Sequence, residues 1–216
     1  MSNSLADSRK GIGSGLAIVV TGPSGAGKNS VIDRVMAMLP GLIYSVSYTS
    51  RPRRPAEVHG EDYVFVSREQ FVQRIEEGDF LEHVTYLDDH YGTSRSQIDD
   101  FISRGLDVIL NIEVKGAKAL QQKDMGTTKF VYAFLTPSST EELESRLRKR
   151  NTEDGEKIQR RLEVAKGEMQ ELPCFDFLII NDDLDTAVQE LASIIISERI
   201  RVTRCEASFK KETNRK

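Results

Sequence analysis

Residues 16–30 read Leu16-Ala17-Ile18-Val19-Val20-Thr21-Gly22-Pro23-Ser24-Gly25-Ala26-Gly27-Lys28-Asn29-Ser30, and this stretch decides the fold. It opens with a continuous apolar run, which is typical of a strand buried on both faces. After it, apolar residues recur at helical spacing from Val31 to Leu39, and Pro40-Gly41 ends them. A strand, a glycine-rich turn and a helix thus follow one another directly, which is the context of a phosphate-binding loop.

The glycine-rich turn has the chemistry of a nucleoside triphosphate site. Its glycines let successive N–H groups point toward an anion, the following helix adds its positive N-terminal end, and Lys28 supplies a cation. Asn29 stands where Ser or Thr normally contacts Mg²⁺, and a hydroxyl follows at Ser30. Because an amide oxygen is a poorer ligand for a hard cation, we expect phosphates and waters to hold the metal. The alternative is a glycine-rich turn that binds nothing.

A chain of 216 residues with 38% hydrophobic residues suits one compact α/β domain with inserted subdomains. No apolar run reaches membrane length, and the N-terminus lacks the apolar region of a signal peptide. Cys174 and Cys205 are too few for a disulfide framework or a metal cluster, so we expect a soluble, cytoplasmic protein. The net charge of −4 argues against nucleic acid as the main partner, so anionic ligands must bind at local arginine clusters.

Arginines follow the second apolar stretch. Residues 42–49 predict a strand, which runs into Ser50-Arg51-Pro52-Arg53-Arg54-Pro55. The prolines stiffen the backbone and reduce the entropy lost when the arginines close around one anion. One guanidinium group binds two phosphate oxygens at once through two parallel N–H donors, so we expect a monophosphate site. The alternative is a solvated surface loop.

The next segment predicts a helix that begins at Ser67 and two short strands, 78–84 and 86–93, around a turn at Asp88-Asp89. From the residues alone, Glu82 is a polar side chain that alternates outward on a half-buried strand. Tyr63 and Tyr91 are equally consistent with ordinary packing.

Residues 96–104 predict a helix, and residues 106–114 predict another buried strand. A carboxylate at the carboxyl end of a strand in a parallel sheet faces the ligand crevice. Glu113 is therefore a candidate for organising the metal or the substrate. The alternative is a surface acid at the end of a strand.

A polar helix pair is expected over residues 138–168, which contain eight basic and eight acidic side chains. It follows a strand over 130–135 and consists of one helix over 141–150 and a second helix after Gly155. Because so polar a pair does not suit a deep core, we expect an exposed flap; the alternative is a salt-bridged surface hairpin. Residues 175–181 then predict the last buried strand, and Asp182-Asp183 caps a closing helix.

The chain divides into one domain with two excursions and two tails. The predicted boundaries are an N-terminal tail at 1–14, a domain at 15–202 and a charged C-terminal tail at 203–216. Within the domain we expect a core at 15–44, 96–137 and 169–202, an excursion at 45–95 and a lid at 138–168. A phosphate loop, an arginine-rich excursion and a flap together favour phosphoryl transfer between two anionic substrates, because that reaction needs positioning, charge neutralisation and exclusion of water.

Several strings together resemble the guanylate kinase family. They are the phosphate loop, Ser45-Val46-Ser47-Tyr48-Thr49-Ser50-Arg51-Pro52-Arg53-Arg54, Gly60-Glu61-Asp62-Tyr63, Tyr91-Gly92-Thr93 and Asn181-Asp182-Asp183. The resemblance covers Leu16 to about Arg201. It implies a P-loop three-layer α/β fold with a parallel central sheet, a mixed α/β GMP-binding excursion and a helical lid. It also implies transfer of the γ-phosphate of Mg-ATP to GMP or dGMP, giving ADP and the diphosphate, in purine nucleotide metabolism, by a monomer or a homodimer.

The resemblance assigns roles to individual residues. The implied catalytic residues are Lys28, Arg51, Arg150 and Arg161. The implied ATP site comprises Gly22, Pro23, Ser24, Gly25, Ala26, Gly27, Lys28, Asn29, Ser30, Arg146, Arg150 and Asn181, the last near the adenine. The implied GMP site comprises Arg51, Arg54, Tyr63 and Tyr91 around the phosphate, Ser47, Glu82 and Thr93 around the guanine, and Glu113 and Arg161. No direct metal ligand is implied, but Ser30 and Glu113 are candidates through water.

Physical chemistry supports the role implied for Glu82. Guanine presents two donors on one edge, N1–H and the 2-amino group, and one carboxylate accepts from both, whereas adenine presents an acceptor there. The sequence departs from the family pattern at Asn29 and at Asn111 and Glu113, where Asp-x-Asp is usual; Lys115 stands where Gln is usual. The arginines are intact, so we expect an active enzyme.

Two rival functions fit parts of the same pattern. Another nucleoside monophosphate kinase would use this architecture on AMP, CMP or UMP. A guanylate-kinase-like module of a scaffold protein would bind a partner peptide without catalysis, but the presence of Lys28, Arg51 and Arg54 argues against it.

Overall fold

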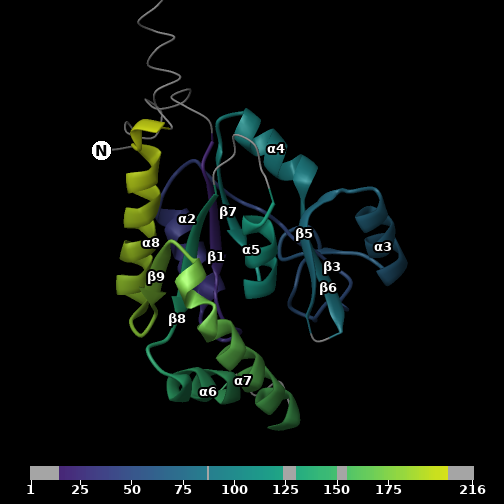
Figure 1. Ribbon diagram of the computed structural model, residues 1–216, viewed down its shortest axis with the longest axis vertical. Helices are drawn as coiled ribbons and strands as arrows, with labels where there is room; N and C mark the ends of the chain where they lie inside the picture. Colours follow the sequence, from purple (N-terminus) through teal and green to yellow (C-terminus); the bar gives the residue numbers. More distant parts are fainter. Residues whose placement is uncertain (1–14, 87, 124–129, 150–154, 204–216) are drawn as a thin grey trace, which may run out of the picture.

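A computed structural model describes residues 15–86, 88–123, 130–149 and 155–203 (Figure 1). Its central sheet has five parallel strands in the order β2-β7-β1-β8-β9. Their bounds are Leu42–Tyr44 (β2), Asp107–Asn111 (β7), Ala17–Thr21 (β1), Phe130–Thr136 (β8) and Phe177–Ile180 (β9). The predicted α/β class with a parallel central sheet is confirmed.

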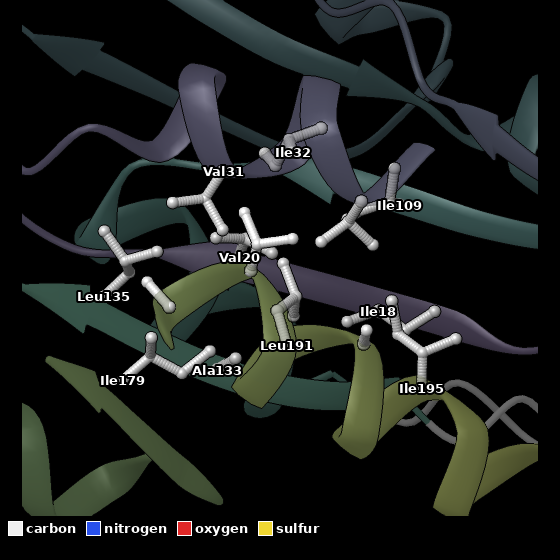
Figure 2. Packing of buried hydrophobic residues seen from close by; sticks show 14 of the residues in the cluster. Ile18, Val20, Val31, Ile32, Ile109, Ala133, Leu135, Ile179, Leu191 and Ile195 are labelled. Carbon is white, nitrogen blue, oxygen red and sulfur yellow. The ribbon is translucent and has the colours of Figure 1, made fainter. Parts of the chain in front are cut away.

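The apolar run in β1 lies at the centre of the sheet because both of its faces are covered. Side chains alternate along a strand, so Ile18 and Val20 enter one hydrophobic core while Ala17 and Val19 enter another. Figure 2 shows the first core, in which Ile18 and Val20 meet residues of two helices; among these is Leu191. A strand buried in this way has no solvent-facing side, which explains its continuous apolar sequence.

Helices cover both faces of the central sheet (Figure 1). One face packs against α2 (Lys28–Met38) and α8 (Leu184–Arg199), and the other packs against α4 (Arg95–Ser103) and α5 (Val114–Gln121). The predicted cap of the closing helix is confirmed at Asp183, whose carboxylate accepts from Thr186 N at 2.8 Å. Within the described residues, none of the helices is both long enough and apolar enough to cross a membrane.

A second, mixed sheet of four strands stands beside the central one, in the order β4-β3-β6-β5. Its strands are Val64–Phe65 (β4), Tyr48–Thr49 (β3), Asp89–Ser94 (β6) and Phe80–Tyr86 (β5). The helix α3 (Arg68–Glu76) belongs to the same region, and it begins at Ser67 with the predicted capping box to Gln70. The two predicted strands are thus confirmed as β5 and β6, but Tyr86 ends the first strand where it was expected to begin the second, and Asp89 begins the second strand where a turn was expected.

The single strand predicted over 42–49 is wrong. β2 ends at Tyr44, and the chain crosses to the other sheet before β3 begins at Tyr48. Ser45 N still donates to Ile109 O at 2.9 Å, so the change of sheet follows directly after that bond. The apolar and β-branched pattern continues across the crossing, which is why the sequence does not reveal it.

The strand predicted over 106–114 is too long. β7 ends at Asn111, and Glu113 is the N-cap position of α5, a helix that the sequence did not predict. Val114 and Gly116 sit in the first turn of that helix, and both residue types are poor helix formers. Packing of Ala117 and Leu120 against the sheet, together with burial of Val114, therefore decides the helix.

The expected helix pair consists of α6 (Thr140–Lys149) and α7 (Gly155–Gln170), followed by the short 3-10 helix η1 (Leu172–Cys174). The pair has a small apolar cluster of its own, made of Leu143, Leu147, Ile158, Leu162 and Ala165. Figure 1 places it at the end of the sheet where β8 ends.

The prediction that 175–181 is a fully buried strand is wrong in part. β9 is an edge strand of only four residues, and Leu178 is 47% exposed. The 3-10 helix η1 and Phe175 come before it, so the apolar run does not all belong to the strand. The tail predicted at 1–14 and the residues from 204 onward lie outside the described residues, as does Arg150.

Candidate active site

A cavity of about 430 Å³ lies at the carboxyl ends of the central strands, where ligands bind in open α/β sheets. It is shared by the glycine-rich loop, the second sheet and α7. Of the residues assigned to a site from the sequence, those that line it are Ser24, Gly25, Ala26, Gly27, Lys28, Asn29, Ser30, Ser47, Arg51, Arg54, Tyr63, Glu82, Tyr91, Glu113 and Arg161. The fold thus brings together residues that lie up to 137 positions apart in the sequence.

The glycine-rich loop has the backbone that anion binding requires. Gly25 and Gly27 have φ values of 90° and 95°, in the left-handed region that side chains disfavour. Gly27 is the N-cap of α2, so the N-terminus of that helix opens onto the cavity. Lys28 Nζ donates to Gly22 O at 2.5 Å and Pro23 O at 3.2 Å, which folds the lysine over the loop.

Two side chains from the C-terminal half hold this loop. Arg161 Nη1 of α7 donates to Ser24 Oγ at 3.2 Å. Asn181, which is 5% exposed, donates from Nδ2 to Ala26 O at 2.7 Å. A Cβ added at Gly27 would overlap this amide nitrogen. Asn181 therefore supports the loop from behind and is not among the residues that line the cavity.

The arginine-rich segment lies at the cavity in a fixed arrangement. Arg51 forms an ion pair with Glu57, with Nη2–Oε1 at 2.7 Å, and its guanidinium lies 5.5 Å from the centre of the Tyr63 ring. Tyr63 and Tyr91 meet edge to face with ring centres 5.9 Å apart. Arg54 is more exposed, and its Nη1 lies 3.8 Å from the same carboxylate.

Glu82 is buried and is not the outward-facing residue that its sequence context also allowed. It is 3% exposed, and Oε1 accepts from Thr93 Oγ1 at 2.7 Å. The pairing of β5 with β6 shifts register between Phe80 and Glu82, so the simple alternation of inward and outward residues breaks there. Within the described residues Oε2 has no hydrogen-bond partner, and burial raises the pKa of this carboxyl to about 7.

The side chains of Asn29 and Asn111, which depart from the family pattern, contact each other. Asn111 Nδ2 donates to Asn29 Oδ1 at 2.7 Å. The amide oxygen of Asn29 is thus engaged by a donor, which makes it still less suited to a cation. Glu113 lines the same cavity, and its Oε2 is buried without a hydrogen-bond partner within the described residues.

The helix pair supplies one of its predicted residues to the cavity. Arg161 lines it, whereas Arg146 pairs along α6 with Glu142, Nε–Oε1 2.7 Å, as their spacing of four residues predicts. Arg150 lies outside the described residues.

Among the side chains near the cavity that the sequence analysis did not assign to a site are Glu57, Tyr86 and Glu168. Glu57 holds Arg51, and Tyr86 lines the cavity from β5. Glu168 of α7 is 6% exposed, and burial, with Glu113 nearby, raises its pKa to about 7 against the opposing effects of Lys28 and Lys115. Glu57 lies three residues beyond Arg54, and that proximity was a signal; nothing in the sequence marked Glu168 among the acids of 138–168.

Comparison with known proteins agrees with this geometry. The family model for guanylate kinase matches residues 14–198. A guanylate kinase of Thermotoga maritima is 42% identical over 190 residues, which cover 88% of this chain and 90% of that protein. One of Symbiobacterium thermophilum is 42% identical over 195 residues, 90% of this chain and 91% of that protein.

A solved structure supports the same assignment. The crystal structure of guanylate kinase from Anaplasma phagocytophilum superposes with a TM-score of 0.74 at 26% identity, covering 89% of this chain and 90% of that one. The match by family model and by sequence spans nearly all of the described residues, including both sheets and the helix pair. The chain therefore belongs to the guanylate kinase family.

Proposed function

We propose that this chain transfers the γ-phosphate of ATP to GMP, giving ADP and GDP, with the residues of the cavity in the roles given below. The observation that carries the proposal is that one cavity is lined both by the Lys28 loop and by Glu82, which is buried, bonded to Thr93 and left with a second acceptor oxygen. This arrangement suits transfer of a phosphoryl group between two nucleotides, because the phosphate-binding loop and the guanine-selecting carboxylate open onto the same cavity.

At the donor end, the backbone of residues 22–30 and the N-terminus of α2 bind the ATP phosphates. When ATP binds, Lys28 exchanges its hydrogen bonds to the carbonyls of Gly22 and Pro23 for contacts with the terminal phosphates. Arg161, which reaches Ser24, brings a second cation to the transferring group. Arg146, Arg150 and Asn181 remain proposals for the ATP side, with Asn181 acting through the loop that it supports.

At the acceptor end, Arg51, Arg54, Tyr63 and Tyr91 bind the GMP phosphate. Glu82 accepts from N1–H and the 2-amino group of guanine, and the hydroxyls of Ser47 and Thr93 complete the recognition of the base. GMP carries an ionised phosphate, so one of its oxygens attacks the γ-phosphorus without a general base. The new P–O bond forms as the bond to the bridging oxygen of ADP breaks.

The residues present fit a magnesium ion held largely by phosphates and water. Within the described residues there is no cluster of three or more His, Cys, Asp or Glu side chains that would bind a metal directly. Glu113 and the exposed Ser30 both line the cavity, and Oε2 of Glu113 has no hydrogen-bond partner among the described residues, so both side chains suit water-mediated contact. When bound, the ion neutralises charge on the transferring phosphates.

The two excursions serve as the moving parts of this scheme. Residues 45–95 carry the acceptor site and residues 138–168 form the lid, with 15–44, 96–137 and 169–202 as the core. Closure of both over the core excludes water, which would otherwise hydrolyse ATP. A cytoplasmic location and a monomeric or homodimeric state are part of the same proposal.

A coupled assay of ADP release tests the function. With ATP as donor, GMP is expected to support turnover, dGMP to substitute for it, and AMP, CMP and UMP to give at most about a thousandth of the GMP value of kcat/KM. Equal rates with all four ribonucleotides, or no turnover with GMP, would overturn the proposal. The second result would favour a binding module without catalysis.

A further inference from the structure

Glu57 follows the arginine-rich segment, residues 50–55, and its carboxylate binds two of that segment's arginines. It is itself 14% exposed in its side chain, although it belongs to a surface loop. Its Oε1 accepts from Arg51 Nη2 at 2.7 Å, and its Oε2 accepts from Arg51 Nη1 at 3.0 Å. The same Oε2 accepts from the backbone N–H of Arg54 at 2.8 Å. One carboxylate therefore holds the side chain of one arginine and the backbone of the other.

The way in which Glu57 binds Arg51 leaves a defined part of the guanidinium for a ligand. A guanidinium has five N–H donors. Within the described residues, both hydrogens of Nη1 are used, by Pro52 O at 2.8 Å and by Glu57, and one hydrogen of Nη2 is used by Glu57. The Nε–H and the second N–H of Nη2 form the other fork, and two parallel donors of this kind match two oxygens of a phosphate.

The rest of the surroundings of Arg51 keep the guanidinium in that orientation. Its plane lies near the Tyr63 and Phe65 rings, 5.5 and 5.7 Å from their centres, and it also interacts with the Tyr91 hydroxyl. Arg51, Tyr63 and Tyr91 all line the cavity, as does Glu57. The anion thus meets a guanidinium held on one edge by a carboxylate and packed against aromatic rings.

We infer that Glu57 is a positioning residue for the acceptor phosphate: it fixes Arg51 and Arg54 before the ligand arrives and directs the lateral fork of Arg51 into the cavity, beside the Tyr91 hydroxyl. The inference rests on the proposed function and deepens it. An arginine fixed beforehand loses less side-chain entropy when the phosphate binds. The carboxylate acts through the arginines and does not touch the phosphate.

The competing idea is that Glu57 occupies Arg51 and must leave when phosphate binds. The two ideas predict opposite signs. If Glu57 positions the arginine, removing its charge weakens binding of the phosphate; if Glu57 competes, removing its charge strengthens binding. The geometry favours positioning, because Glu57 takes the terminal fork of the guanidinium and leaves the lateral one.

The test compares Glu57→Gln and Glu57→Ala with the matched control Glu76→Gln, an exposed glutamate of α3. With saturating ATP, KM for GMP is expected to rise about tenfold in Glu57→Gln and about tenfold to a hundredfold in Glu57→Ala. The KM for ATP and kcat at saturating GMP stay within about twofold, since the donor end is untouched. Glu76→Gln leaves all of these values unchanged.

Several outcomes would overturn the inference. The first is an unchanged or lowered KM for GMP in Glu57→Gln. The second is a fall in kcat together with a rise in KM for both GMP and ATP, which would indicate a structural role alone. Thermal unfolding shows whether a variant is folded. If Glu57→Ala fails to fold, the kinetics of Glu57→Gln decide between the two ideas, because glutamine keeps the shape of the side chain.

Binding of inorganic phosphate, followed by phosphorus NMR, separates this inference from the proposed function. The wild type is expected to bind phosphate more tightly than Glu57→Gln even where no turnover is measured. If the wild type gives no GMP-dependent turnover but shows this difference in phosphate binding, the proposed function fails and the role of Glu57 stands. Equal or tighter binding by the variant overturns the role of Glu57, whatever the turnover.

Discussion

Asn111 Nδ2 donates a hydrogen bond to Asn29 Oδ1 at 2.7 Å, so the two amides that depart from the family pattern contact each other in the lining of the cavity. In sequence they lie 82 residues apart, one after the glycine-rich loop and the other at the end of β7. A hydroxyl and a carboxylate are usual at these positions in the family. The amide pair connects the loop to the end of β7.

This pair predicts non-additive effects of mutation. Asn29→Ala and Asn111→Ala are each expected to lower the free energy of unfolding, and the double variant to lose less than the sum, with a coupling of about 0.5–1 kcal/mol. Urea unfolding of the four proteins measures this coupling. Strict additivity would mean that the hydrogen bond contributes nothing to stability.

Glu82 predicts a dependence of GMP use on pH. Its folded pKa is raised to about 7 by burial, and only the ionised form accepts from both guanine donors. The value of kcat/KM for GMP should therefore rise with pH through about 7 and fall below it. Initial rates across this range measure the effect.

Glu82→Gln provides the control for that profile. The amide presents one acceptor and one NH₂ group to the two donors of guanine, so kcat/KM for GMP is expected to fall by about a hundredfold to a thousandfold and to lose the titration near 7. The KM for ATP should change less than about twofold, because the donor end is intact. Retention of the pH profile in this variant would assign the titration to another group.

Substitution of Gly116 offers a second way to displace the Glu82 carboxylate. A Cβ at this position of α5 would overlap Oε2 of Glu82 and lie 2.8 Å from Ile112 Cγ2. Gly116→Ala should therefore move Glu82 and raise KM for GMP by about tenfold or more, even though alanine favours a helix by about 1 kcal/mol over glycine. GMP kinetics together with thermal unfolding check this expectation.

Gly167 in α7 offers the matched control. A Cβ added there meets nothing within 4 Å. Gly167→Ala should leave KM for GMP unchanged and keep or slightly raise the melting temperature. If both alanine variants behaved alike, the close approach between α5 and Glu82 would have no role in recognition.

Lys28 predicts a separation of catalysis from acceptor binding. Lys28→Met removes the cation that the proposed function assigns to the donor phosphates, so turnover should fall by about a thousandfold or more, while the affinity for GMP alone stays within about twofold. Rapid quench and calorimetric titration with GMP measure the two quantities. Turnover close to that of the wild type would exclude the assigned role of Lys28.

Glu168 predicts that stability depends on pH. Burial raises its pKa from the ordinary value of 4.5 to about 7, so between these pH values the folded state holds a proton that the unfolded state has lost. The carboxyl then destabilises the fold increasingly as pH rises. Relative to wild type, Glu168→Gln should be near neutral at about pH 5 and more stable by on the order of 2–3 kcal/mol at about pH 8.

Urea unfolding at several pH values measures this difference. Glu163→Gln, at an exposed position of the same helix, is the control and should show no such trend. A constant difference between Glu168→Gln and wild type at all pH values would contradict the titration of this buried acid.

The sequence by itself determined the central architecture. A continuous apolar strand, a glycine-rich turn and an amphipathic helix specify local backbone states that neighbouring residues impose, so β1, the loop and α2 follow from composition and spacing. The capping residues Ser67 and Asp183 were likewise readable, because a cap is a contact between residues three positions apart. The anion site at residues 51–54 was inferred from its arginines and prolines, whereas the role of Glu82 was named through family resemblance.

Only the tertiary structure decided what depends on contacts between distant segments. The strand expected over 42–49 divides between two sheets, and α5 forms because the central sheet buries one of its faces. The burial of Glu82 against α5, the hydrogen bond between Asn111 and Asn29 and the proximity of Glu168 to Glu113 each join residues that no local pattern connects. Hydrogen bonds, burial and pKa values are properties of three-dimensional neighbours, and the sequence order alone does not specify those neighbours.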